Sequence, residues 1–256
     1  MPPASARRGP SVFQLPPGQV PLERALSKLG LATRTQARQW IAEGRVAVDG
    51  RVQTDPLWGV IPERVRIDID GAATVRMTET KVLALHKPRG VLTTRTDPQG
   101  RKTVYDLLTD VPDHLIPVGR LDQATSGLLL LTNHTRLHDR LLDPQLGLER
   151  VYLAVVEGRV EQQDLPLYLA GVLDQGVRLQ AHAVELRKSS GRESTLLLTL
   201  CEGRNREVRR LCATLGHPVS KLKRVRYGPV ELGDLPIGQW RWLDAAPLLL
   251  AAGLAK

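Results

Sequence analysis

The stretch that most constrains the fold is Gly119-Arg120-Leu121-Asp122-Gln123-Ala124-Thr125-Ser126-Gly127, which is followed by four consecutive leucines at 128–131. An apolar run at 116–118 precedes it, so the pattern predicts a polar loop between two short buried strands. Loops of this kind present reactive groups on a rigid scaffold, and an aspartate beside buried strands needs a cation or several hydrogen bonds to stay ionised. Asp122 is therefore a candidate catalytic residue, with a structural turn aspartate as the alternative.

On both sides of this loop, the sequence predicts strands and helices in irregular alternation. Apolar strands are expected at 82–85, 151–156, 177–186 and 195–200, and helices at 103–108, 204–215 and 244–256. A further helix carrying Leu137, Leu141 and Leu142 is expected to be capped by Asn133. This irregular mixture indicates an α+β fold and not a doubly wound sheet.

The N-terminal part of the chain has a different pattern. Residues 1–20 are rich in proline and are predicted to be a disordered tail. Residues 21–70 predict two helices, the second capped by Thr33, and then a β-hairpin turning at Asp49-Gly50. The small, polar segment 71–80 is predicted to be a linker, so the second domain spans 81–256.

Charge is the most informative feature of the composition. The 256 residues carry a net charge of +9, and eight basic residues lie between positions 202 and 226 against two acidic ones. A focused basic patch is typical of proteins that bind a polyanion such as nucleic acid. No apolar run is long enough to cross a membrane, and the two cysteines, Cys201 and Cys212, have no metal-type spacing. We therefore expect a cytoplasmic protein.

The N-terminal pattern resembles a known RNA-binding module. The matching stretches are Leu31-Ala32-Thr33-Arg34, Glu43-Gly44-Arg45-Val46 and Val48-Asp49-Gly50. They are similar to the S-four-type module, in which the second helix and the hairpin present basic residues to the RNA backbone. The resemblance implies that Arg34, Arg38 and Arg45 contact RNA; the alternative is an ordinary α+β subdomain with exposed arginines.

The second domain resembles the RsuA-type ribosomal pseudouridine synthases. The motifs that carry the resemblance are Gly119-Arg120-Leu121-Asp122 with Thr125-Ser126-Gly127-Leu128, Lys87-Pro88-Arg89-Gly90, Arg150-Val151-Tyr152, Glu202 through Arg210, and Leu222-Lys223-Arg224. These motifs occur in the family's order. Together with the N-terminal module, the resemblance covers about residues 20–243. The family implies a mixed, largely antiparallel sheet and the isomerisation of uridine to pseudouridine in RNA.

The resemblance also implies roles for single residues. Asp122 matches the essential aspartate, Tyr152 the tyrosine that stacks on the target base, and Arg209 the arginine that pairs with the carboxylate. Leu222 matches the apolar wall of the base site and Arg120 the basic residue at its mouth. Arg204, Arg206 and Lys223 are expected to contact RNA. The reaction needs no cofactor and no metal; His134 and His138, four residues apart, have no evident third ligand.

Three functions remain open at this point. The residues of the loop and of the basic helix resemble those of the large-subunit members of the family more closely. They favour large-subunit (23S) ribosomal RNA as the substrate, and small-subunit (16S) RNA is the alternative. A non-catalytic factor that binds ribosome assembly intermediates would keep the basic surfaces without turnover, and a hydrolase acting on nucleosides is the third. We expect the protein to be a monomer.

Overall fold

The computed structural model describes residues 15–16, 18–74, 79–108, 110–111 and 114–255. Backbone contacts divide the chain into two compact units, Met1–Thr78 and Glu79–Lys256. The predicted tail falls mostly on residues 1–14 and 17, which lie outside the described residues, but Val20, at its end, belongs to strand β1. None of the described helices is long and apolar enough to cross a membrane.

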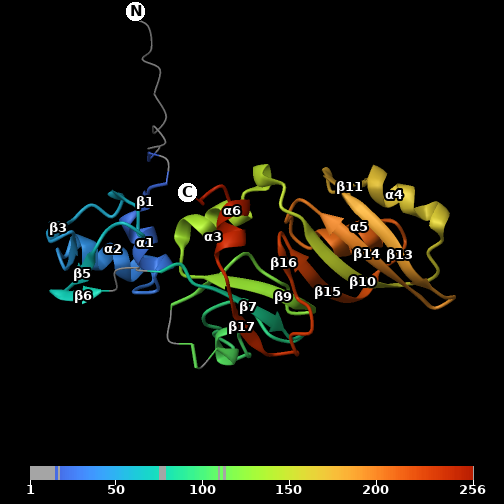
Figure 1. Cartoon of the computed structure of the whole chain (residues 1–256), viewed down its shortest axis with the longest axis horizontal. Helices are drawn as coiled ribbons and strands as arrows, with labels where there is room; N and C mark the ends of the chain where they lie inside the picture. The colour runs from blue at the N-terminus through green and yellow to red at the C-terminus, as the bar shows by residue number, and fades with distance from the viewer. Residues whose placement is uncertain (1–14, 17, 75–78, 109, 112–113, 256) are drawn as a thin grey trace, which may run out of the picture. The chain divides into compact units, whose positions relative to one another are not determined.

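The N-terminal unit consists of two short helices and small strands (Figure 1). Its elements are β1 (Val20–Pro21), α1 (Leu22–Lys28), α2 (Arg34–Ala42), β2 (Val46–Val48), β3 (Arg51–Gln53), β4 (Gly59–Val60), β5 (Ile67–Ile69) and β6 (Ala72–Thr74). Leu26 of α1, Ile41 of α2 and Val46 of β2 are fully buried in one apolar cluster. The helix–helix–hairpin arrangement expected from the sequence is confirmed.

Local signals in this unit act as predicted, with one exception. The Thr33 side chain accepts a hydrogen bond from the backbone of Gln36, whose own side chain caps Thr33 in return. Asp49 and Gly50 both have positive φ, as the two-residue turn between β2 and β3 requires. The exception is the predicted linker: Ala72–Thr74 form β6, which pairs with β5. Backbone pairing, invisible in the composition, holds these small residues.

The second unit is built on a nine-stranded sheet (Figure 1). Seven strands lie in the order β13-β14-β10-β15-β9-β7-β17, while β8 pairs with β9 and β16 with β15. The strands are β7 (Val82–Lys87), β8 (Ile116–Pro117), β9 (Thr125–Thr132), β10 (Arg150–Glu157), β13 (Ala183–Ser189), β14 (Glu193–Leu200), β15 (Val219–Tyr227), β16 (Val230–Glu231) and β17 (Trp240–Leu243), with β11 (Val172–Asp174) and β12 (Val177–Leu179) in a separate pair. The helices are α3 (Thr135–Leu142), α4 (Leu165–Ala170), α5 (Glu207–Thr214) and α6 (Ala246–Ala251), with short 3-10 turns at Tyr105–Leu107, Pro144–Leu146 and Gln162–Asp164.

Strand β9 is buried on both faces, which explains its four leucines. Leu128 and Leu130 belong to the cluster that includes residues of α3 and α6, whereas Leu129 and Leu131 belong to a second cluster on the opposite face. Strand residues alternate between faces, so a strand covered on both sides is apolar without interruption. The buried strand predicted after the loop is therefore confirmed.

The parallel pair of β9 and β15 brings distant parts of the chain together. Thr125 lies opposite Leu222, and Gly127 opposite Arg224. A Cβ on Gly127 would come within 2.2 Å of the Arg224 carbonyl oxygen, and the φ of Gly127 is +108°, so only glycine fits this approach. The other strand pairs of this sheet are antiparallel, which confirms an α+β fold with a mixed, largely antiparallel sheet.

Four elements differ from the expectation. The helix expected at 103–108 is a single 3-10 turn at Tyr105–Leu107, because Thr103 forms a β-bridge with Leu92. Helix α5 begins at Glu207 and not at 204, since Arg206 has left-handed φ and ψ. The strand expected at 177–186 is interrupted at Ala181, whose N–H donates to the Tyr168 carbonyl. Helix α3 is capped by the ring of His134, while Asn133 binds the backbone of the segment before β7.

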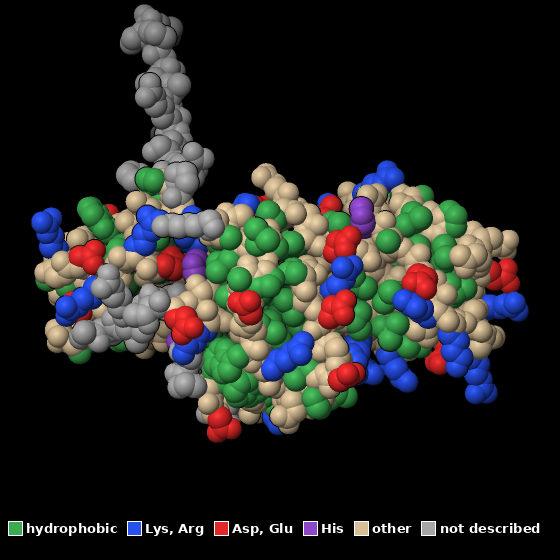
Figure 2. Space-filling view, in the orientation of Figure 1, with side chains coloured by type: hydrophobic (Ala, Val, Ile, Leu, Met, Phe, Trp, Pro, Cys, Tyr) green, Lys and Arg blue, Asp and Glu red, His purple; other side chains and the backbone are tan. Residues whose placement is uncertain are grey.

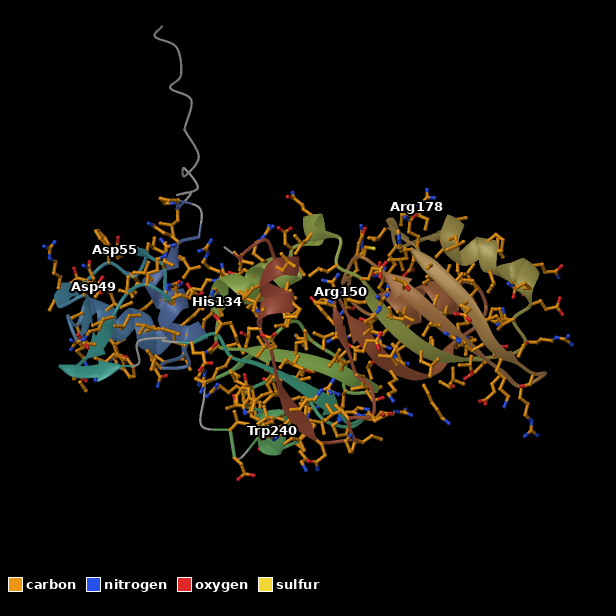
Figure 3. The ribbon with its side chains drawn as sticks, viewed as in Figure 1. Asp49, Asp55, His134, Arg150, Arg178 and Trp240 are labelled. Carbon is orange, nitrogen blue, oxygen red and sulfur yellow. The ribbon has the colours of Figure 1, made fainter. Side chains whose placement is uncertain are left out.

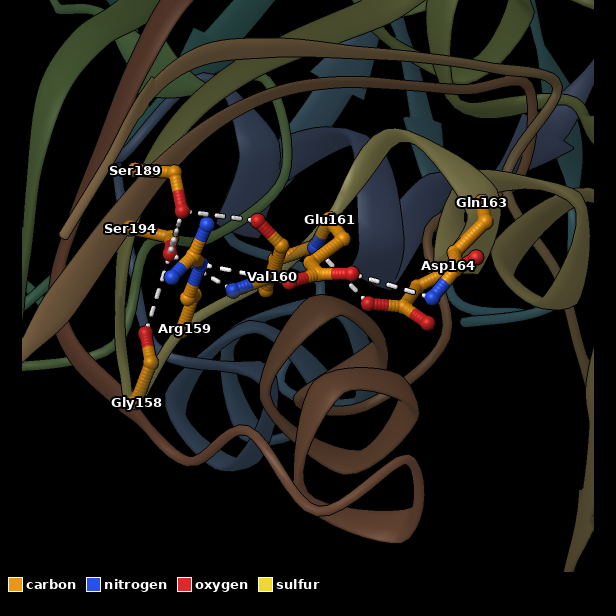
Figure 4. A network of polar contacts seen from close by, with 8 residues as sticks. All are labelled: Gly158, Arg159, Val160, Glu161, Gln163, Asp164, Ser189 and Ser194. Carbon is orange, nitrogen blue, oxygen red and sulfur yellow. Dashed lines mark hydrogen bonds and ion pairs between the residues drawn. The ribbon is translucent and has the colours of Figure 1, made fainter. Parts of the chain in front are cut away.

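The end of β10 is fixed by a compact polar network (Figure 4). Ser194 donates to the Gly158 carbonyl and accepts from the Val160 N–H, and Ser189 donates to the Val160 carbonyl. The next residues turn into a short helix in which Asp164 accepts from the Glu161 N–H. These bonds satisfy the backbone where β10 leaves the sheet, and they hold β10 in register with β14.

Candidate active site

A cavity of about 730 Å³ lies where the β9–β15 pair approaches the residues that enter α5. Its lining includes side chains from the loop and start of β9, from β10, from the segment entering α5 and from β15. They are Arg120, Asp122 and Thr125; Arg150 and Tyr152; Arg204, Arg206 and Glu207; and Leu222, Arg224 and Tyr227. The predicted catalytic aspartate, the tyrosine and the apolar residue therefore share one cavity.

The Asp122 loop is fixed through its backbone. The Lys87 ammonium, at the end of β7, donates to the carbonyls of Asp122 (3.2 Å), Thr125 (2.9 Å) and Pro88 (3.0 Å). The Thr125 N–H also donates to the Asp122 carbonyl, at 2.9 Å. The carboxylate itself is left for other contacts, and its side chain is 35% exposed.

Lys87 is the functional candidate that the sequence analysis missed. The side chain is completely buried, and this desolvation lowers the pKa of its ammonium to about 8, although the charge of Asp122 acts in the opposite direction. In the sequence, Lys87 stands out only as a part of the motif Lys87-Pro88-Arg89-Gly90. The signal that could have found it is a lysine directly after five buried residues of a strand, where a charge needs a specific partner.

The arginine beside the carboxylate is not the expected one. Arg206 Nη1 lies 3.6 Å from Asp122 Oδ2, whereas Arg209 donates to the carbonyls of Ala124 (3.1 Å) and Val219 (2.9 Å). The direct pair of Arg209 with Asp122 is therefore wrong in this structure. The cause is local: left-handed backbone at Arg206, directly before α5, brings its side chain to Asp122, while Arg209 ties α5 to the loop and to β15.

Tyr152 and Leu222 flank the cavity from neighbouring strands. Tyr152 lies opposite Arg224, and Leu222 lies opposite Ala154, in the β10–β15 pair. Leu222 is buried and Tyr152 is half-buried, so an aromatic face and an aliphatic wall are both available to a planar ligand. Leu222 also lies opposite Thr125 of β9, the third residue after Asp122.

Two buried arginines form a part of the cavity that the sequence did not single out (Figure 3 labels Arg150). Arg150 donates to the carbonyls of Leu148, Cys201 and Leu141, and its guanidinium lies 4.9 Å from the Tyr227 ring centroid. Arg224 lies 5.0 Å from the same ring. Only their positions within Arg-Val-Tyr and Lys-Arg-Val-Arg-Tyr-Gly could have indicated them.

The remaining predicted RNA contacts divide into two groups. Arg120 and Arg204 are exposed at the cavity, and Arg204 pairs with Glu202. Lys223 does not line the cavity, because it alternates with Leu222 along β15 and so belongs to the other face. The arginines of the N-terminal unit lie on their own surface: Arg38 pairs with the buried Glu23, Arg45 with Asp70, and Arg34 is exposed.

The histidine pair has structural contacts. His134 accepts the Leu137 N–H at the start of α3, and His138 lies 2.9 Å from the Asp139 carboxylate. Within the part of the chain that the structure describes, no three His, Cys, Asp or Glu side chains gather as metal ligands would. The site as described combines a fixed carboxylate, an aromatic ring and several cations, an arrangement suited to chemistry on an anionic substrate with a planar base.

Comparison with known proteins gives the class. A family model described as RNA pseudouridylate synthase matches residues 81–214, and one described as S4 domain matches residues 20–60. The chain therefore belongs to the RNA pseudouridylate synthase family and carries an S4 domain in its N-terminal unit.

Individual relatives agree with this membership. The chain is 38% identical to an uncharacterized RNA pseudouridine synthase of Aquifex aeolicus, over 92% of this chain and 96% of the relative. It is 36% identical to ribosomal large subunit pseudouridine synthase B of Bacillus subtilis, over 87% and 91%. A crystal structure of a pseudouridylate synthase matches with a TM-score of 0.61 at 26% identity, covering 91% of this chain and 99% of the other.

Proposed function

We propose that this protein isomerises a specific uridine of large-subunit ribosomal RNA to pseudouridine. The observation that carries the proposal is the position of Asp122: a carboxylate on a loop fixed by Lys87, in one cavity with Tyr152 and Leu222. Relatives named ribosomal large subunit pseudouridine synthase B, 36–40% identical to this chain, support the choice of substrate.

The chemistry divides among these side chains. The N1–C1′ bond of the uridine breaks, the base turns, and a C5–C1′ bond forms, while C5 loses a proton and N1 gains one. Asp122 acts at the junction of sugar and base, and Tyr152 stacks on the base and serves the proton transfer at C5. Leu222 forms the opposite apolar wall. Atoms balance within the nucleotide, so no cofactor or metal is needed.

The cations around the cavity hold the RNA. A uridine inside folded RNA must be extruded, at a cost of a few kcal/mol, and phosphate contacts offset this cost. Arg120 enters the place of the extruded base, Arg204 contacts the backbone at the cavity, and Arg209 keeps α5 against the loop. Lys223, on the other face of β15, contacts the RNA backbone outside the cavity. Arg206 leaves Asp122 for a phosphate when RNA binds; its side chain is 51% exposed and its distance from the carboxylate, 3.6 Å, is long for a hydrogen bond.

The two units divide the work. Residues 21–70 act as the RNA-binding module through Arg34, Arg38 and Arg45, and residues 81–256 act as the catalytic domain. The S4 match over 20–60 supports the first assignment. We expect a cytoplasmic monomer that acts on ribosomal RNA or on assembling particles.

The test is tritium release from RNA labelled at uridine C5, using large- and small-subunit ribosomal RNA separately. Release accompanies formation of the C5–C1′ bond, so it reports isomerisation and not binding. We expect release from large-subunit RNA and a loss of at least about a thousandfold in Asp122→Asn. The matched control is Asp234→Asn, which changes an exposed carboxylate outside the cavity and should react normally.

Other results select the alternatives. Release only from small-subunit RNA would change the substrate and leave the reaction. Tight RNA binding without release from either RNA, or from assembly intermediates, would indicate a non-catalytic assembly factor. Free base or abasic RNA among the products would indicate a hydrolase.

A further inference from the structure

Strand β17 carries an aromatic pair that the proposed reaction does not use: Trp242 is exposed, and Trp240 is half-buried. Trp240 and Trp242 lie two residues apart, on the same face of the strand, with ring centroids 5.7 Å apart and ring planes at 74°. Trp242 is 42% exposed and the nearby Ile237 is 68% exposed. We call Ile237, Trp240 and Trp242 the tryptophan edge. Figure 2 shows hydrophobic side chains gathered over β17, and Figure 3 labels Trp240 there.

The tryptophan edge lies at an open side of the sheet. Among the described strands, β17 pairs with β7 alone and is the last in the strand order. An exposed edge with large apolar side chains is an interaction surface by default, since native proteins otherwise protect such edges. The question is what kind of molecule this surface receives.

Charge around the edge favours an anionic partner. The Lys81 ammonium lies 5.8 Å from the Trp242 ring centroid. The segment 88–105, whose Val91 and Val104 belong to the same apolar cluster that Trp240 packs against, exposes Arg89, Arg95 and Lys102. The one acidic residue of this segment, Asp97, is paired with Arg101. Aromatic faces beside basic side chains are the combination that binds single-stranded nucleic acid.

The edge is continuous with the catalytic loop. The Gly238 N–H donates to the His86 carbonyl, and the His86 N–H donates to the Gln239 carbonyl. The next residue, Lys87, donates to the Asp122 carbonyl, and the Gly90 N–H donates to the Gln123 carbonyl. Leu121 belongs to the apolar cluster that Trp240 packs against, and Tyr152 borders that cluster as well.

The spacing suits a short stretch of nucleotides. Trp242 lies opposite Leu83, four residues before Lys87 on β7. Four strand residues span about 13 Å, and stacked nucleotides are about 3.4 Å apart along a strand, so about four nucleotides bridge the interval.

We propose that the tryptophan edge binds unpaired nucleotides of the RNA that flank the target uridine, with a base stacked on Trp242 and phosphates near Lys81 and Arg89. This inference rests on the proposed RNA substrate and extends it to a second contact surface. Stacking does not depend on base identity, so the edge selects unpaired strand and not sequence. A protein strand added to the open edge is the competing occupant, and the cations between the edge and the catalytic loop argue against it.

The experiment compares Trp242→Ala and Trp242→Phe with Leu173→Ala, which removes an exposed apolar side chain from β11 (73% exposed, against 42% for Trp242). Fluorescence anisotropy measures the affinity for a short oligouridylate and for an RNA duplex of the same length. We expect Trp242→Ala to weaken oligouridylate binding about tenfold, the scale of one lost base–aromatic stack, and to leave duplex binding unchanged. Trp242→Phe should restore most of the affinity, and Leu173→Ala should bind as the wild type does.

Equal oligouridylate affinity in Trp242→Ala and the wild type would overturn the proposal. If Trp242→Ala fails to fold, Lys81→Gln decides the matter: a reduced dependence of oligouridylate affinity on salt supports the proposal, and an unchanged dependence overturns it. Tritium release is measured in parallel. Its absence in the wild type would overturn the proposed function alone, because the oligouridylate affinities test the edge without turnover.

Discussion

Two arginines of the N-terminal unit and three buried cations of the catalytic unit are held in opposite ways. In the N-terminal unit, Arg38 makes a two-pronged contact with Glu23, a carboxylate that is only 7% exposed. Arg45 binds Asp70 in the same way, at 2.9 and 2.6 Å. Carboxylates of the same unit therefore neutralise the positive charges of both guanidinium groups.

In the catalytic unit, the buried cations are held by neutral oxygens. Arg150 donates to three backbone carbonyls and to the Tyr227 hydroxyl, and Arg224 donates to the Leu128 carbonyl. Lys87 donates to three carbonyls. No ion pair of these three side chains is recorded among the described residues. Their charge is therefore retained around the cavity, where it attracts an anionic substrate.

The two ways of holding a cation have different consequences for stability and for ligand binding. A paired arginine stabilises its own unit, and we expect it to give up the pair if it binds RNA. The positive charge of a cation held by carbonyls is not neutralised and stays available to an anionic ligand. The cost of the second arrangement is desolvation, which backbone hydrogen bonds offset only in part.

The largest expected effect on stability is that of Arg150→Met. Three carbonyls and a hydroxyl would lose a charged donor, so we expect the free energy of unfolding to fall by about 3–5 kcal/mol, measured by urea denaturation. Arg159→Gln, at an exposed pair with Glu161, is the control and should unfold as the wild type does. An Arg150→Met protein as stable as the wild type would show that the carbonyl-held arginine does not stabilise the catalytic unit.

The pH dependence of activity tests Lys87 as a cation held by carbonyls. Its pKa of about 8 means that the ammonium loses a proton just above neutral pH, and an amine has two N–H donors for three carbonyls. We expect tritium release to decline as pH rises through 8, because the Asp122 loop loses a bond.

The deprotonation of Lys87 does not itself destabilise the fold. The unfolded chain keeps the Lys87 proton up to about its ordinary pKa of 10.5, so the contribution of Lys87 to stability increases with pH between 8 and 10.5. Urea denaturation of the wild type and of Lys87→Met at several pH values measures this contribution as a difference. Activity that stays constant to pH 9 would count against the role of Lys87.

Arg38→Gln tests the paired arrangement and should have a smaller effect. Removing Arg38 leaves the buried Glu23 carboxylate without its guanidinium, and we expect the unfolding midpoint at pH 7 to fall by about 3 °C. Hydrogen bonding to Arg38 holds the pKa of Glu23 below its ordinary 4.5, so the pair stabilises the fold above that pH and is lost in acid. The difference between variant and wild type should therefore vanish in acid; a constant difference would argue against the ion pair.

Arg34→Gln should have the smallest effect on stability and a selective one on RNA. Arg34 is exposed at the start of α2, and no hydrogen bond or ion pair of its side chain is recorded among the described residues. We expect an unchanged unfolding midpoint, a few-fold weaker RNA affinity and a salt dependence reduced by about one phosphate contact. A larger loss of RNA affinity in Arg38→Gln than in Arg34→Gln would show that the paired arginine makes the stronger RNA contact.

Short-range chemistry made much of this fold predictable. The Thr33 cap, the Asp49-Gly50 turn and the leucines of β9 depend on a few neighbouring residues, and the structure confirms them. What failed depends on distant partners: β6 exists because β5 pairs with it, and Gln180 and Ala181 leave the strand pattern because Ala181 binds Tyr168.

The sequence predicted which residues belong to the site, but it did not predict which of them contact one another. Asp122, Tyr152 and Leu222 share the cavity because β9, β10 and β15 are neighbours, which the family resemblance implied. That Arg206 and not Arg209 meets Asp122 follows from one left-handed residue, and no local pattern marks a non-glycine residue for that conformation.

The parallel contact of β9 and β15 has a consequence for synthesis of the chain. Ser126 donates to the carbonyl of Leu222, 96 positions later, and Leu222 lines the cavity. A chain emerging from the ribosome possesses Asp122 long before it possesses β15, so it has the carboxylate without a pocket. The activity therefore begins only when the domain is nearly whole, and a partly made chain can hold RNA through its first unit without altering it.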